Sequence, residues 1–205
     1  MDSKELPKGY RRVAEGMEIV VSLVFTFLGM VTANRSLSLT SIGLSLYNFI
    51  VAWMYFNHRP AKNTAQWWET ALAVGGTFLP LVAFRPASMA SMTGIREEIG
   101  MLIQLFGLMG MIWSVFSLGT SLGIAPADRG LVMSGPYRHV RHPMYTFEIV
   151  FCLGYWLANL SWLNVAVWLL LVIIQVTRAL REERAIEGYD EYAAQVRWRF
   201  IPHIV

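Results

Sequence analysis

The chain has 205 residues, of which 55% are hydrophobic and only 15% are charged. Soluble domains usually have about a quarter of their residues charged, so the composition predicts an integral membrane protein. The net charge of +3 indicates basic residues beside anionic lipid, and no nucleic-acid partner is expected. The single cysteine, Cys152, excludes an internal disulfide.

Six apolar segments are long enough to cross a bilayer as helices, which takes about 17 to 25 residues. They cover residues 17–33, 37–56, 67–84, 99–118, 144–160 and 162–180. The connection between the last two is short and predicts a helical hairpin. We expect the sixth helix to end near residue 186. After a break at Gly188, a short amphipathic helix is predicted over residues 190–196.

Basic residues are distributed unevenly among the connections between these segments. With the N-terminus inside, only Arg35, Arg85 and Arg96 of the 17 Lys and Arg residues fall in outer connections. Inner connections of membrane proteins are enriched in Lys and Arg, so we predict that both termini lie in the cytoplasm. The expected protein is an all-α, multi-pass protein of a bacterial inner membrane. Gly119 and Gly123 form a GxxxG pattern, which permits close approach of another helix.

Residues 134–148 form a polar, basic and ring-rich segment that runs into the fifth apolar segment. Proline suits the first turn of a helix, so a helix is predicted to begin near Pro143, with Arg141 and His142 at its edge. Arg141, Tyr145 and Glu148 are spaced i, i+4, i+7 and share one face. Such a face can bind a small zwitterion. The alternative is a basic membrane anchor with a tyrosine reaching the interface.

Glu148 lies about one and a half turns inside the fifth segment. An ionisable group within a membrane helix is costly, and its presence indicates a functional site. The alternative is a buried ion pair with Arg138 or Arg141.

Glu182 and Glu183 follow the sixth segment, where carboxylates oppose the helix dipole. Either they have a function there, as acceptors for hydroxyl or ammonium groups, or a solvated charge network with Arg178 and Arg181 stabilises them. His139 and His142 have i, i+3 spacing, but no further metal ligand accompanies them, so no metal site is predicted.

These pieces occur in an order that resembles the isoprenylcysteine carboxyl methyltransferase family and its phospholipid N-methyltransferase relatives. The resemblance covers roughly residues 121–205. It is carried by LVxSGPYxxxRHPxY over residues 131–145, the predicted hairpin, Glu182-Glu183, Tyr189-x-x-Tyr192 and the closing RFIP of residues 199–202.

The resemblance implies a methyltransferase that uses S-adenosylmethionine on the cytoplasmic side, in a pocket closed by the C-terminal segment. It divides one membrane domain, residues 1–205, into transmembrane helices (1–120) and a catalytic, cofactor-binding region (121–205). A lipophilic acceptor, such as a prenylated carboxylate or a related lipid, would enter from the bilayer. The implied cofactor-binding residues are Leu131, Val132, Gly135, Tyr137, Arg141, His142, Pro143, Tyr145, Glu182 and Glu183.

Catalytic roles are expected for Arg141, Glu148 and Arg199. Arg199 would orient a carboxylate acceptor, whereas an amine acceptor would need a base, for which Glu148 is the candidate. The acceptor can be a carboxylate, an amine or a hydroxyl. The family often has a histidine where this chain has Arg129, which puts that cofactor contact in question.

Two other classes of protein compete with a methyltransferase. Sterol-type reductases have a similar RHPxY motif and use NADPH, but the SGPY lead-in and the adjacent glutamates favour methyl transfer. A structural or transport protein is the third interpretation. The gathering of polar residues at one membrane surface argues against it.

Overall fold

The computed structural model describes residues 39–57, 67–83, 94–123 and 128–204, together with positions 20, 23, 24 and 27. The described residues form helices and no strand, which confirms the predicted all-helical fold. The chain divides into two compact units, Met1–His58 and Arg59–Val205. The first predicted segment, residues 17–33, lies almost entirely outside the described residues.

In the first unit, helix α2 (Leu39–Phe56) matches the second predicted segment, 37–56. Its sequence is mostly apolar and carries no charge, which is typical of a helix that is surrounded by apolar groups. Asn57 directly follows the helix, and its side-chain Nδ2 donates to the carbonyl oxygen of Trp53 at 2.8 Å. This bond satisfies one of the carbonyls that a helix end leaves free.

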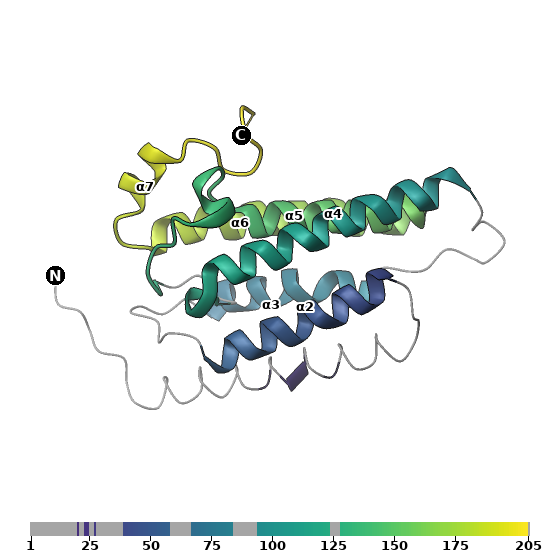
Figure 1. Ribbon diagram of the computed structural model, residues 1–205, viewed down its shortest axis with the longest axis horizontal. Coiled ribbons are helices and arrows are strands. Elements are labelled where there is room, and N and C mark those ends of the chain that lie inside the picture. The colour runs from purple at the N-terminus through teal and green to yellow at the C-terminus, as the bar shows by residue number, and fades with distance from the viewer. Residues whose placement is uncertain are drawn as a thin grey trace. The chain divides into compact units, whose positions relative to one another are not determined.

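The second unit holds the other helices (Figure 1). The long ones are α3 (Trp67–Ala83), α4 (Ile95–Leu118), α5 (Pro143–Ala158) and α6 (Trp162–Ala185). Two 3₁₀ turns, η2 (Gly119–Ser121) and η3 (Gly135–Arg138), and the short α7 (Tyr189–Gln195) complete it. These four long helices agree with the predicted segments 67–84, 99–118, 144–160 and 162–180 to within a few residues at each end. Helix α4 begins four residues earlier than predicted.

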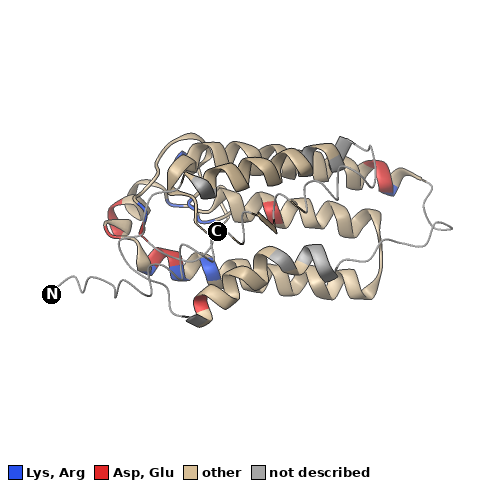
Figure 2. Cartoon of the chain, turned by 90° about the horizontal axis from the view of Figure 1, so that it is seen from below, with Lys and Arg blue, Asp and Glu red and all other residues tan. Residues whose placement is uncertain are grey.

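Two of these helical stretches, Ile95–Ser121 and Trp162–Ala185, are long and apolar enough to cross a membrane. That number is smaller than the six predicted spans, so the count of spans and their orientation stay predictions. Charged side chains gather at the ends of the helices, and the stretches between them are almost free of charge (Figure 2).

Glycines on α4 and α5 allow these two helices to touch backbone to backbone. A Cβ added at Gly107 would lie 2.6 Å from the backbone nitrogen of Phe151, and one at Gly110 would overlap the ring of Phe147. Further along, a Cβ at Gly154 would meet the carbonyl oxygen of Gly100 at 2.6 Å. The α4–α5 contact is the most extensive between the described elements. It fixes where α5 begins relative to the loop after α4.

The GxxxG pattern of Gly119 and Gly123 was expected to permit close approach of another helix. In the structure these two glycines have other roles. Gly119 ends α4 with a φ of 53°, in the left-handed region that favours glycine. No described atom lies within 4 Å of a Cβ added there. A Cβ at Gly123 would overlap the guanidinium of Arg129, so this glycine makes room for that side chain.

The predicted hairpin of α5 and α6 is confirmed. Ser161 caps α6, because its hydroxyl accepts a hydrogen bond from the amide of Asn164 at 3.1 Å. Asn164 Nδ2 donates to the carbonyl of Asn159 at 2.7 Å, and the indole of Trp168 donates to Ile149 at 3.0 Å. The hairpin brings the start of α5 next to the end of α6, where the two charged motifs lie.

Candidate active site

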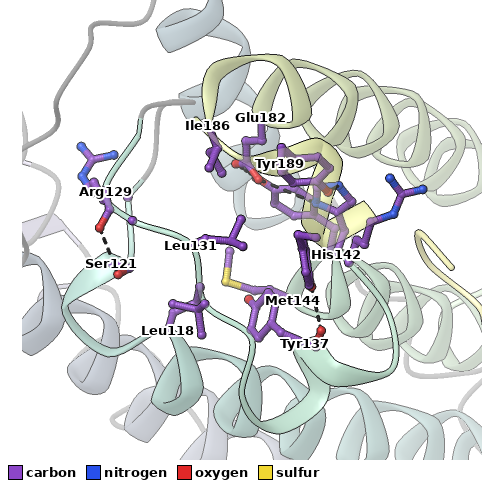
Figure 3. A pocket seen from close by; sticks show the side chains of 16 residues that line it. Leu118, Ser121, Arg129, Leu131, Tyr137, His142, Met144, Glu182, Ile186 and Tyr189 are labelled. Atoms are coloured by element: carbon purple, nitrogen blue, oxygen red, sulfur yellow. Dashed lines mark hydrogen bonds and ion pairs between the residues drawn. The ribbon is translucent and has the colours of Figure 1, made fainter. Parts of the chain in front are cut away.

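A pocket lies where the loop after α4 meets the start of α5, the end of α6 and α7 (Figure 3). The cavity has a volume of about 90 Å³, and the cavity and its open mouth together hold about 730 Å³ of empty space. Its apolar lining consists of Leu118, Leu131, Val132, Met144 and Ile186. Its polar lining includes Arg129, Tyr137, Arg141, His142, Tyr145, Glu182, Tyr189 and Tyr192.

His142 is the N-cap residue of α5 and lies among three aromatic rings. Its ring stacks on Tyr145 with the centroids 5.8 Å apart, and on Tyr189 at 6.3 Å. Phe200 covers it at 5.7 Å with the planes tilted by 33°. The imidazole is therefore fixed between α5, α7 and the C-terminal segment. Only 5% of His142 is exposed.

Glu183 is surrounded by two arginine side chains and the imidazole of His142. Arg199 Nε donates to its Oε1 at 2.9 Å and Arg199 Nη2 to its Oε2 at 3.2 Å. Arg141 Nη1 lies 3.3 Å from Oε1, as does His142 Nε2. The hydrogen bond to Glu183 raises the pKa of Arg199. The charge of Glu183 is thus neutralised within the protein, and Glu183 does not line the pocket.

Glu182 does line the pocket and has fewer partners. The phenol of Tyr145 donates a short hydrogen bond to its Oε1. Its Oε2 lies 3.8 Å from His142 Nδ1. Of the two adjacent glutamates, Glu182 is therefore the one that offers a carboxylate to a ligand.

Helix α7 closes one side of the pocket with two tyrosines. The Tyr192 hydroxyl donates to the carbonyl of Tyr137 at 2.7 Å, and Tyr189 forms a hydrogen bond with His142 Nε2 at 3.1 Å. Burial raises the pKa of Tyr192 to about 12 and raises the pKa of Tyr189 well above its usual value. Tyr189, Tyr192 and Val196 pack against Leu131 and Ile186.

The C-terminal segment binds the start of α5 through main-chain hydrogen bonds. The amide of Arg141 donates to Trp198 at 2.8 Å, and that of His142 donates to Arg199 at 2.9 Å. The Thr146 hydroxyl donates to Phe200 at 3.1 Å. These bonds hold the C-terminal segment against the start of α5, where Phe200 contacts the ring of His142.

The structure brings most of the predicted cofactor-binding residues together. Leu131, Val132, Tyr137, Arg141, His142, Tyr145 and Glu182 line the pocket, and Glu183 and Arg199 contact lining residues or each other. Pro143 is buried as the first residue of α5. Gly135 begins η3 with a φ of 58° and approaches Ser117, so it shapes the loop and does not line the pocket. The roles of all these residues stay predictions.

Glu148 does not line the pocket. Its Oε2 accepts a hydrogen bond from Gln175 Nε2 at 2.6 Å, across the interface of α5 and α6. The suggested pairing with Arg138 or Arg141 is not what the structure shows. Its predicted catalytic role is untested.

The sequence interpretation assigned no site role to Met144, Ile186, Tyr189 or Tyr192, which line the pocket. The two tyrosines could have been recognised from the sequence, because they form the Tyr-x-x-Tyr pair that follows the glutamates. Gln175 was also missed, and Arg178 was considered only as a partner of Glu182 and Glu183, although polar residues three positions apart in an apolar helix are a recognisable signal.

The described residues thus form a helical protein with a pocket of mixed apolar and polar lining at the ends of two hairpin helices. Residues 95–189 match the sequence profile described as phospholipid methyltransferase. This match confirms, over residues 95–189, the resemblance inferred from the motifs. The matched range spans α4 to the first residue of α7. No curated protein matches the chain.

The match to this family indicates a methyltransferase, and the two long apolar helices fit a membrane-associated family. The matched range contains the pocket residues from Leu118 to Tyr189 but stops before Tyr192 and Arg199. It also excludes α2 and α3.

Proposed function

We propose that the protein is an S-adenosylmethionine-dependent methyltransferase that acts on a lipophilic acceptor at the cytoplasmic face of a bacterial membrane. One observation carries the proposal. Residues of the family-matched segment converge from α5, α6 and α7 on one pocket, whose lining combines apolar side chains with the charged side chains of Arg129, Arg141 and Glu182.

The pocket residues suit a ligand that has both charges and an aromatic ring. Arg141 is 9% exposed, and its Nε is buried without a hydrogen-bond partner among the described residues. A buried donor of this kind is costly unless a ligand or water accepts from it. Glu182 offers a carboxylate to a positive group or a hydroxyl. S-adenosylmethionine would supply an electrophilic methyl group on a positively charged sulfur.

The protein's own contribution is to orient the reactants and exclude water. Methyl transfer needs the attacking atom about 3–3.5 Å from the methyl carbon and in line with the bond that breaks. The aromatic stack around His142, which includes Phe200 of the C-terminal segment, leaves only 5% of this side chain exposed to solvent. The apolar lining, formed in part by Leu118, Met144 and Ile186, suits the chain of a lipid acceptor.

The acceptor is proposed as an isoprenylcysteine-type carboxylate or a related lipid. A carboxylate is ionised at neutral pH, so no base is needed to activate it. Arg141 is then available to orient it through a charge-assisted hydrogen bond. An amine acceptor requires a base, and within the described pocket lining only His142 and Glu182 provide one.

Calorimetry on the purified protein in detergent tests the cofactor. S-adenosylmethionine and S-adenosylhomocysteine are expected to bind, and NADPH is expected not to bind. Binding of NADPH without binding of either sulfur nucleoside would replace the methyltransferase proposal with a reductase. Transfer of a labelled methyl group to N-acetyl-S-farnesylcysteine, compared with phosphatidylethanolamine vesicles, then separates a carboxylate acceptor from an amine acceptor.

A further inference from the structure

Beside the pocket, the apolar helices α5 and α6 share three polar side chains: Glu148, Gln175 and Arg178. Gln175 is 0% exposed and Arg178 is 3% exposed. Gln175 Nε2 donates to Glu148 Oε2 at 2.6 Å, and Gln175 Oε1 accepts from Arg178 Nη1 at 3.0 Å. Buried polar groups are costly unless they are hydrogen-bonded, so each side chain constrains the next.

Arg178 reaches the pocket through Tyr145. Its Cζ lies 4.8 Å from the centroid of the Tyr145 ring, within the range at which a cation is attracted to an aromatic face. The hydroxyl of the same ring donates to Glu182. Tyr145 is 2% exposed. Arg178 contacts the face of its ring and Glu182 accepts from its hydroxyl, so the side chain is held at both ends.

Helix α3 leaves room for this arrangement. A Cβ added at Gly76 would lie 2.6 Å from Ile174 Cγ2 and 3.5 Å from both Cδ and Nη1 of Arg178. A larger residue at this position would displace Ile174 and press on the Arg178 side chain. Helix α3 lies outside the family-matched range, so this part of the network was not implied by the family.

We propose that Arg178 is a positioning residue for methyl transfer. It fixes the Tyr145 ring and, through the Tyr145 hydroxyl, the orientation of the Glu182 carboxylate that lines the pocket. Gln175 and Glu148 hold Arg178 in place. The inference rests on the proposed function, because it assumes that Glu182 binds the ligand of a methyltransferase.

Arg181, nearly one turn further along α6, is a matched control. Its Cζ lies 4.5 Å from the ring of Trp68, and its Nη1 lies 3.8 Å from Glu69 Oε1. It therefore makes the same two kinds of contact as Arg178, with an aromatic face and with a polar partner. Its partners lie on α3, and it is not among the residues that line the described pocket.

The test measures S-adenosylhomocysteine affinity by calorimetry and thermal stability on the full chain in detergent. Arg178→Met should weaken binding about tenfold, because it removes the cation that fixes the ring. Arg178→Lys keeps a cation and should stay within about threefold of the wild-type affinity. Arg181→Met should leave the affinity unchanged.

A double-mutant cycle shows whether Arg178 acts through Tyr145. In a Tyr145→Phe background the ring remains but the hydroxyl that orients Glu182 is gone. Arg178→Met should then cost less than about threefold in affinity, since two residues that act as one unit are not additive. If Arg178→Met does not fold, Gln175→Met loosens the same arginine and should weaken binding in the wild-type background only.

The outcomes separate this inference from the proposed function. A wild-type protein that does not bind S-adenosylhomocysteine overturns the proposed function and, with it, the inference. Wild-type binding that Arg178→Met leaves unchanged while the melting temperature falls makes Arg178 a stability residue. Equal losses in the wild-type and Tyr145→Phe backgrounds also overturn the inference, because Arg178 then acts independently of the Tyr145 hydroxyl.

Discussion

Arg199 Nε donates a hydrogen bond to Glu183 Oε1 at 2.9 Å, and this contact joins the C-terminal segment to the end of α6. The neighbouring main-chain bonds of Trp198 and Arg199 join the same segment to the start of α5. A segment that follows the family-matched range is therefore fixed to both helices of the hairpin. Its position beside His142 gives it a direct influence on the pocket.

Replacement of Arg199 by glutamine should loosen this segment while the helices stay folded. The side chain of Arg199 is 40% exposed, so solvent screens the pair and the expected loss is only about 1 kcal/mol. Hydrogen exchange of residues 197–204 should become faster, and exchange within α6 should not change. Arg197→Gln is the control, because the Arg197 side chain stacks on Trp198 without any described carboxylate contact. Equal exchange rates in Arg199→Gln and the wild type would show that the main-chain bonds alone hold the segment.

Two substitutions of Glu148 separate its hydrogen bond from its charge. Glu148→Gln keeps an oxygen that can accept from Gln175, so the fold should survive with a small loss of stability. Glu148→Leu removes the acceptor and leaves the buried Gln175 Nε2 without a partner, which costs about 1–3 kcal/mol. Thermal unfolding in detergent should therefore rank the wild type first, Glu148→Gln next and Glu148→Leu last. A Leu variant as stable as the Gln variant would mean that this hydrogen bond contributes nothing to the fold.

The predictable parts of the fold are the helices that correspond to long, uniformly apolar stretches of sequence. Apolar runs predicted α2 to α6, and Pro143 and Gly188 predicted where α5 begins and where α6 gives way to α7. The motif residues Arg141, Tyr145 and Glu182 were predicted to meet, because a short hairpin connection leaves the two helices no other arrangement.

What could not be predicted depends on how each helix is rotated about its axis. Gly107 and Gly110 direct α4 against α5, but an apolar helix offers several faces of similar composition, and the GxxxG pattern drew attention to Gly119 instead. Glu148 was expected to share a functional face with Arg141 and Tyr145, yet it does not line the pocket, and its carboxylate accepts a hydrogen bond from Gln175 of α6. The contact of Arg178 with Tyr145 depends on the same rotation.

Stability should fall in alkaline solution because of Tyr192. Burial raises its pKa to about 12 in the folded protein, whereas an exposed tyrosine in the unfolded chain has a pKa near 10. Between about pH 10 and pH 12 the unfolded chain binds fewer protons, so the free energy of unfolding decreases as the pH rises. Tyr189 acts in the same direction, since burial also raises its pKa.

Absorbance at about 295 nm, which reports tyrosinate, checks this prediction. Tyr192→Phe should show one late-titrating tyrosine fewer than the wild type. The midpoint temperature of wild-type thermal unfolding should decrease as the pH is raised from about 9 to about 11. In Tyr192→Phe the midpoint should be lower at about pH 9, because the bond to the Tyr137 carbonyl is lost, and should fall less steeply with pH. Identical pH dependence in both proteins would exclude Tyr192 as the cause.

Substitution of alanine for glycine at two helical positions should have opposite effects on stability. At Gly107 the new Cβ would lie 2.6 Å from the Phe151 nitrogen and 2.8 Å from its Cα, and backbone atoms of a packed helix cannot move aside cheaply. Overpacking of this kind costs about 1–3 kcal/mol.

Gly75 on α3 is the matched control, because no described atom lies within 4 Å of its added Cβ. There alanine should raise stability by up to about 1 kcal/mol, since glycine is the poorer helix former. Thermal unfolding of both variants in the same detergent measures the difference, and a Gly107→Ala protein as stable as Gly75→Ala would mean that α4 and α5 do not approach as closely as the structure shows.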